Sequence, residues 1–119
     1  MAINTKTNEH LLKLIADLKK KSYDEKVNTW SAVAEDLSSP TRKSRIVNLY
    51  KLSLYVNDNE TALVPGKVLG SGEMTKKMTV AAYSFSKQAL DKINKAGKAI
   101  TIQELMAKNP KAEKVRIIG

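Results

Sequence analysis

The sequence has 119 residues, 42% of them hydrophobic and 28% charged, and this balance is typical of one soluble globular domain with a single core. Because it contains no cysteine, disulfides, thiolate catalysis and the usual structural zinc sites are excluded. Lys and Arg number 21 against 12 Asp and Glu, and the formal net charge of +9 indicates a polyanion as partner. No apolar run reaches the roughly 20 residues of a membrane span, and the start of the chain lacks a hydrophobic secretion signal. We therefore expect a cytoplasmic protein without a membrane partner.

The whole chain, residues 1–119, is predicted to be a single domain whose N-terminal portion, residues 1–39, holds two amphipathic helices. In the first, leucines and an isoleucine recur three and four residues apart. This helix is expected to end at Lys19–Lys21, where the helix dipole favours cations, so we interpret these lysines as helix-ending rather than ligand-binding. The second helix starts near Asn28 and is expected to bury Trp30.

Residues 40–119 are predicted to form an α/β portion. A short strand at 46–47 should lead into a helix capped by Asn48, although one longer strand remains the alternative. The segment 61–69 predicts another strand, in which Pro65–Gly66 implies an edge position or a bulge.

The remaining elements follow with clear boundary signals. A strand is predicted over 78–85, then a helix capped by Ser86 and ended by Gly97. The capping box Thr101–Glu104 predicts a further helix, and the tail 113–119 is expected to add one last strand. Helices first, then alternating strands and helices, indicate a mixed α/β fold.

Residues 66–77 read GKVLGSGEMTKK, with three glycines before a pair of lysines. A P-loop needs GxxxxGK followed by Ser or Thr at the start of a helix, and neither the spacing nor the strand that follows fits. The glycine loop of protein kinases joins two strands, as expected here, but Thr75 stands at the third glycine and the lysine of the next strand is missing. The sequence therefore does not support a nucleotide-binding loop.

The rest of the chain is poorly supplied for catalysis. His10 is the only histidine and falls near the start of the first helix, where a surface residue is the plain interpretation. The acidic pairs Asp24–Glu25 and Glu35–Asp36 are explained by helix solubility. We predict that the protein is not an enzyme, binds no cofactor or metal, and takes no small-molecule substrate.

The glycine-rich segment suits a loop that holds a nucleic acid backbone. We expect a hairpin in which glycines allow close approach and loop N–H groups donate to phosphates. The alternative is a hairpin whose glycines only satisfy turn geometry and whose lysines keep an edge strand soluble. Basic residues recur in two further loops, which favours binding. The predicted RNA-binding residues are Arg42, Lys43, Arg45, Gly66, Lys67, Gly70, Gly72, Lys76, Lys77 and Arg116.

Most of the aromatic side chains fall at apolar-face positions, so the sequence does not predict a platform on which single-stranded bases stack. Recognition of phosphates and shape in folded RNA or duplex is the better expectation. A small DNA-packaging or regulatory nucleic-acid-binding protein is the alternative that the charge allows, and a kinase-like nucleotide binder is a third.

Three stretches, SPTRKSRIVNLYKL, VPGKVLGSGEMTKKMTVAAYSFS and the closing VRIIG, resemble the large-subunit ribosomal protein family called eighteen-e of archaea and eukaryotes. The likeness runs over nearly the whole chain and is strongest from Pro65 to Ser86. The short length of the chain is more similar to that of the archaeal members. That family is in turn similar to the bacterial ribosomal protein fifteen. The resemblance implies an irregular β-β-α superhelix and a structural role in the large subunit, bound to rRNA and next to neighbouring ribosomal proteins.

Overall fold

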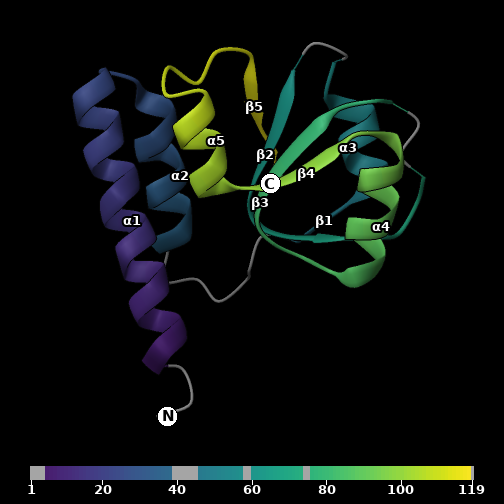
Figure 1. Cartoon of the computed structure of the whole chain (residues 1–119), viewed down its shortest axis with the longest axis horizontal. Helices are drawn as coiled ribbons and strands as arrows, with labels where there is room; N and C mark the ends of the chain where they lie inside the picture. The colour runs from purple at the N-terminus through teal and green to yellow at the C-terminus, as the bar shows by residue number, and fades with distance from the viewer. Residues whose placement is uncertain (1–4, 39–45, 58–59, 74–75, 119) are drawn as a thin grey trace.

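The structure is a computed structural model that describes residues 5–38, 46–57, 60–73 and 76–118 (Figure 1). Within these ranges it contains five helices and five strands. The helices are α1 (Thr5–Glu25), α2 (Asn28–Ser38), α3 (Leu49–Tyr55), α4 (Lys87–Ala96) and α5 (Ile102–Lys108). The strands are β1 (Ile46–Asn48), β2 (Thr61–Leu69), β3 (Thr79–Phe85), β4 (Lys98–Thr101) and β5 (Val115–Ile117).

All the strand pairings described are parallel, and β2 is the central strand. β3 lies along one side of β2, with β4 beyond it. On the other side of β2, two short strands lie end to end, because β5 pairs with residues 61–63 and β1 with residues 67–69. The pairing of β2 with β3 shifts in register between Val64 and Lys67, which confirms the predicted bulge. The edge position offered as the other explanation is wrong, because β2 has partners on both sides.

The parallel pairing of β2 and β3 also corrects the expected hairpin. A parallel partner must start at the same edge of the sheet, so the chain returns from the end of β2 to the opposite edge before β3 begins, instead of turning tightly. This crossover runs alongside α3. The backbone N–H of Tyr50 donates to the Ser71 carbonyl (3.3 Å), and the Ser53 hydroxyl donates to the Glu73 carbonyl (3.2 Å). Successive crossovers of this kind agree with the superhelix that the family resemblance implied, and the mixed α/β class is confirmed.

Helices cover both faces of this sheet (Figure 1). Alternate residues of a strand point to opposite faces, and the buried residues of β2 follow that period. Ala62 and Val64 lie in the core beneath α3 and α4, whereas Leu63 lies in the core beneath α1, α2 and α5. Trp30 of α2 is fully buried in the second core, as predicted. The two N-terminal helices therefore share a core with the sheet.

The helix boundaries set by local hydrogen bonds agree with prediction. The Ser86 hydroxyl accepts from the Ala89 backbone N–H, and Thr101 with Glu104 forms the complete capping box. The end of α1 is different, because the helix continues to Glu25 and leaves Lys19–Lys21 inside it rather than in its last turn. Strand β4 was not predicted at all, since its four residues carry no alternating pattern of their own.

Candidate nucleic-acid interface

The carboxyl ends of β1, β2 and β3 meet at one edge of the sheet, the lower edge in Figure 1, and the glycine-rich segment starts there. A Cβ on Gly70 would lie 2.6 Å from Cγ of Gln88 and 3.0 Å from the backbone nitrogen of Ala89. Gly72 has a φ of +91°, and a Cβ there would lie 2.6 Å from Cβ of Tyr50. Residues 70–72 are thus wedged between the first turns of α3 and α4. Only glycine fits at these two positions without a shift of the neighbours.

A partly exposed lysine on α4 holds this segment against the protein. Nζ of Lys92 donates to the carbonyl oxygens of Gly70 (2.8 Å) and Gly72 (2.9 Å), and lies 3.8 Å from a carboxylate oxygen of Glu73. Its charge is therefore directed at backbone carbonyls. This contact could not be predicted from the sequence, because a lysine in a helix looks like any solvated lysine and its partners lie about 20 positions earlier in the chain.

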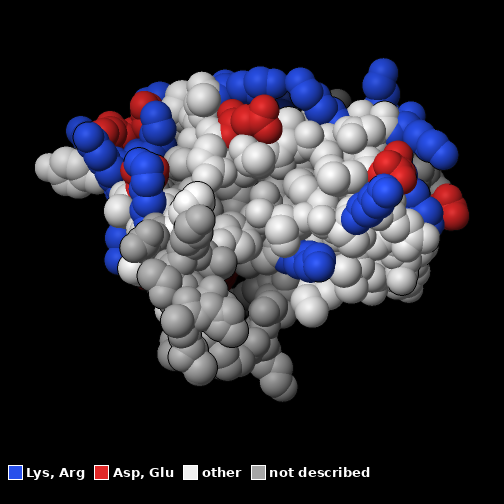
Figure 2. Space-filling view, turned by 60° about the horizontal axis from the view of Figure 1, so that its bottom comes forward, with Lys and Arg blue, Asp and Glu red and all other residues white. Residues whose placement is uncertain are grey.

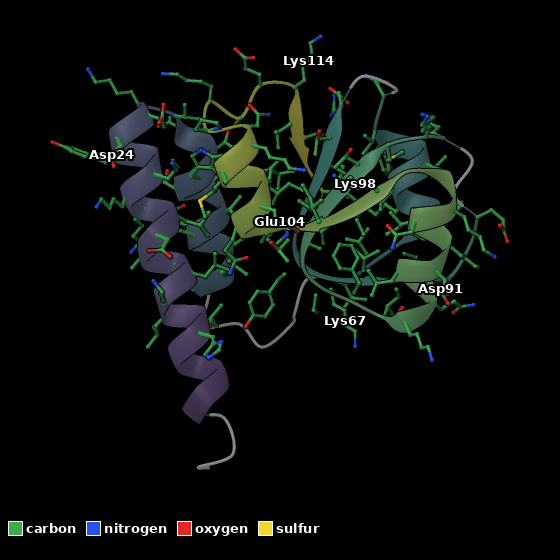
Figure 3. All side chains as sticks on the ribbon, viewed as in Figure 1. Asp24, Lys67, Asp91, Lys98, Glu104 and Lys114 are labelled. Atoms are coloured by element: carbon green, nitrogen blue, oxygen red, sulfur yellow. The ribbon has the colours of Figure 1, made fainter. Side chains whose placement is uncertain are left out.

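The predicted basic residues do not gather in one place. Arg42, Lys43 and Arg45 lie outside the described residues. Lys67 is exposed toward the carboxyl end of β2, where its register partners are Ile46 and Ser84 (Figure 3). The other described residues of this set lie toward the opposite, amino edge. The crossover brings Lys76 and Lys77 there, because Lys77 closely precedes β3, and β5 places Arg116 there by pairing it with Ala62 near the start of β2.

The basic residues at the two edges also differ in their partners. Nζ of Lys76 donates to the carbonyl of Val56 (2.8 Å), which ends α3. Nε of Arg116 donates to a carboxylate oxygen of Glu60 (3.0 Å). Lys67 and Lys77 are both exposed, and neither has an ion pair with another described residue. Among the predicted phosphate contacts that the structure describes, these two are both exposed and without an ion pair.

Glu60 offers a test of the amino-edge contacts. Hydrogen bonds from the Asn57 backbone N–H and from Arg116 hold the pKa of the Glu60 carboxyl below its ordinary value of 4.5. A group with a lowered folded pKa contributes stability that is present above its unfolded pKa and is lost as the pH falls through the folded value. We therefore expect Glu60→Gln to lower the melting temperature slightly at pH 7, with a difference from the parent protein that shrinks as the pH falls below 4.5 toward 3. An equal loss at both pH values would contradict this origin. Arg116→Gln, which removes the hydrogen bond from Arg116 to Glu60, should cause part of the same loss in melting temperature, with the same dependence on pH.

The tyrosines depart from the expectation drawn from their apolar-face positions. Tyr23, Tyr50, Tyr55 and Tyr83 are all exposed. In α3 the buried side holds Leu49 and Leu52, so the tyrosines of that helix point outward. The four rings belong to three elements, α1, α3 and β3, and the two on α3 are five positions apart, on different sides of the helix. The described rings therefore do not line up as a continuous stacking surface.

Figure 2 turns the bottom of Figure 1 toward the reader and shows Lys and Arg mainly along the rim of this face, with fewer acidic side chains among them. Among the described residues, no group of three or more His, Cys, Asp or Glu is placed to hold a metal ion. None of the described helices has an apolar stretch long enough to cross a bilayer.

Comparison with known proteins places the chain in a family. The model of the family described as ribosomal proteins 50S-L15 and 50S-L18e, together with a 60S member, matches residues 11–101. The chain is 44% identical to the large ribosomal subunit protein eL18 of Methanothermobacter thermautotrophicus over 115 residues, which cover 96% of this chain and 95% of that protein. The eL18 proteins of Methanococcus maripaludis and Haloarcula marismortui are 44% and 43% identical, over 100% and 96% of this chain and 97% and 98% of their own lengths. The chain therefore belongs to the large-subunit ribosomal protein family of 50S-L15 and 50S-L18e.

Proposed function

We propose that the protein is a structural constituent of the large ribosomal subunit that binds and stabilises folded rRNA, next to neighbouring ribosomal proteins. The observation that carries this proposal is identity of 44% with an archaeal large-subunit protein over 96% of the chain. A formal charge of +9 gives the chain the electrostatics that such a partner requires. The family consists of ribosomal proteins rather than enzymes, which confirms the prediction that the chain is not an enzyme, and such proteins are cytoplasmic.

The binding mechanism proposed is neutralisation of RNA phosphates by the seven basic residues among those predicted from the sequence, of which Lys67 has the clearest geometry. Its side chain is exposed, and it lies beside β1, whose preceding segment carries Arg42, Lys43 and Arg45. Lys67 has no carboxylate partner among the described residues. Its ammonium group can therefore bind a phosphate without first giving up the interaction energy of an existing ion pair. The wedged glycines contribute differently, by keeping the segment that follows β2 close to the sheet.

A salt series with large-subunit rRNA tests this function. If about six phosphates are neutralised, the logarithm of the association constant should fall with the logarithm of salt concentration with a slope of roughly −4 to −5. Binding should persist in an excess of random duplex DNA. A slope near zero would exclude the electrostatic mechanism, and equal competition by duplex DNA would favour the DNA-packaging alternative.

Single substitutions sharpen the test. Lys67→Gln should weaken rRNA binding and make the slope shallower by about 1, because one phosphate contact is lost. Lys20→Gln removes the same charge from an exposed position on α1 and serves as the matched control. If both variants change the slope equally, Lys67 contributes only to the overall charge.

A further inference from the structure

An open hollow of about 510 Å³ lies at the amino edge of the sheet, between the start of β3, the start of β4 and the end of α4. Lys77 lines one wall, and Lys95 and Lys98 line the other. The two walls are held together by backbone contacts. The N–H of Lys98 donates to the carbonyl of Met78 (3.1 Å), and Gly97 packs directly against that same carbonyl. The hollow is therefore built by the fold, and no single loop contains it.

The charge around this hollow is positive. Lys77, Lys95 and Lys98 are exposed, and none of them forms an ion pair with a described carboxylate. Glu60 also lines the hollow, but its carboxylate accepts hydrogen bonds from the Asn57 N–H and from Arg116 (both 3.0 Å). That carboxylate is thus offset by Arg116 and leaves the three lysines without a counter-charge of their own.

Lys98 also lies beside Lys108 of α5, which does not itself line the hollow. Direct contact with the amino group of Lys98, followed by repulsion between the two charges, lowers the pKa of Lys108 below its ordinary value. Glu104 acts in the opposite direction but is the smallest of the influences on this group (Figure 3). Two amines held this close destabilise each other in their charged forms, and an anion beside them would relieve the repulsion.

We propose that the amino-edge hollow is a binding site for a phosphodiester group of the rRNA backbone, with Lys77, Lys95 and Lys98 as its contacts. The proposal rests on the rRNA-binding function above and adds a site to it. A volume of about 510 Å³ lies within the usual range of ligand sites and admits a phosphate with its flanking riboses. Lys95 and Lys98 were not among the predicted contacts, because on either side of a helix-ending glycine they look like solvated lysines. Only the packing of Gly97 against Met78 brings them opposite Lys77.

The test compares two double variants that remove the same charge. The double variant Lys95→Gln, Lys98→Gln removes two positive charges that line the hollow. The double variant Lys19→Gln, Lys20→Gln removes two exposed positive charges from α1. Each is titrated with large-subunit rRNA across a salt series, and its melting temperature is measured to confirm folding. In parallel, the parent protein is treated with an amine-reactive acylating reagent, with and without rRNA, and acylation is mapped by mass spectrometry.

We expect the hollow variant to bind rRNA about tenfold more weakly near 0.15 M salt, with a slope shallower by about 1.5 to 2. The α1 variant should lose much less affinity and keep its slope. Binding should protect Lys95 and Lys98 from acylation more than Lys19 and Lys20. Equal loss in the two variants, no loss in either, or unprotected hollow lysines would each overturn the site while leaving the proposed function intact. If the parent protein itself fails to bind rRNA, the proposed function fails, and the site fails with it.

Discussion

Replacing Gly97 with alanine should destabilise the protein by about 3 kcal/mol, at the upper end of what overpacking usually costs. A Cβ at this position would lie 2.0 Å from the carbonyl oxygen of Met78 and 2.8 Å from its nitrogen. Both atoms are backbone, so no side-chain rotation can relieve the contact. The start of β3 would have to separate from the start of β4, where the Lys98 N–H donates to that same carbonyl.

Urea unfolding followed by circular dichroism measures this loss, which should also appear as a fall in melting temperature of roughly 10 °C. Gly70→Ala is the milder comparison. Its closest contact, Cγ of Gln88 at 2.6 Å, can rotate away, although Cβ of Gln88 at 2.8 Å and the Ala89 nitrogen at 3.0 Å must still shift slightly. We expect a smaller loss there, of about 1 kcal/mol. If the Gly97 variant proves as stable as the parent protein, the close approach between the two chain segments is wrong.

The second large effect is expected at Trp30. Its side chain is fully buried in the core beneath α1, α2 and α5, and its Nε1–H donates to the carbonyl of Pro110 (2.8 Å). Trp30→Ala leaves a large cavity and should cost about 3 to 5 kcal/mol. Leu14 and Leu18 of α1 still share that core with Leu63 of β2 after the substitution, so the helices and the sheet should unfold together in one transition.

Trp30→Phe separates the two contributions. It keeps an aromatic ring but removes the N–H donor and leaves the Pro110 carbonyl without this partner, so we expect an intermediate loss of about 1 to 3 kcal/mol. Both variants are followed by far-ultraviolet circular dichroism, since the only tryptophan is the one replaced. Two separate transitions in the Trp30→Ala protein would contradict the shared core and show that the helices fold apart from the sheet.

The sequence by itself determined those features whose interactions are local. The cap at Ser86 and the capping box at Thr101 and Glu104 join residues three positions apart, so the residue pattern alone contains both partners. The bulge in β2 follows from Pro65, which has no N–H for the ladder, and from the permissive backbone of Gly66. The family resemblance could also be recognised from the sequence alone, since it depends on the order of residues and not on their arrangement in space.

The direction of strand pairing was decided only by the tertiary structure. Two strands joined by nine residues predict a hairpin as readily as a crossover, and the choice depends on where α3 and α4 pack. With the crossover, the glycine-rich segment spans two edges of the sheet, so Lys67 at its start and Lys77 at its end come to lie apart. The same sequence pattern therefore corresponds to two separated basic positions rather than one loop.

The interaction partner of each basic side chain likewise could not be predicted from the sequence. Lys92 is directed at two glycine carbonyls, Lys76 at a helix end and Arg116 at Glu60, through partners 20 to 56 positions away. Lys95 and Lys98 instead line a hollow with Lys77. A lysine's own neighbours in the chain do not say whether its charge meets a carbonyl, a carboxylate or solvent. That outcome depends on which distant groups the fold places within reach of the ammonium group. The composition therefore indicates a polyanion as partner, but only the packing shows which lysines are available to bind it.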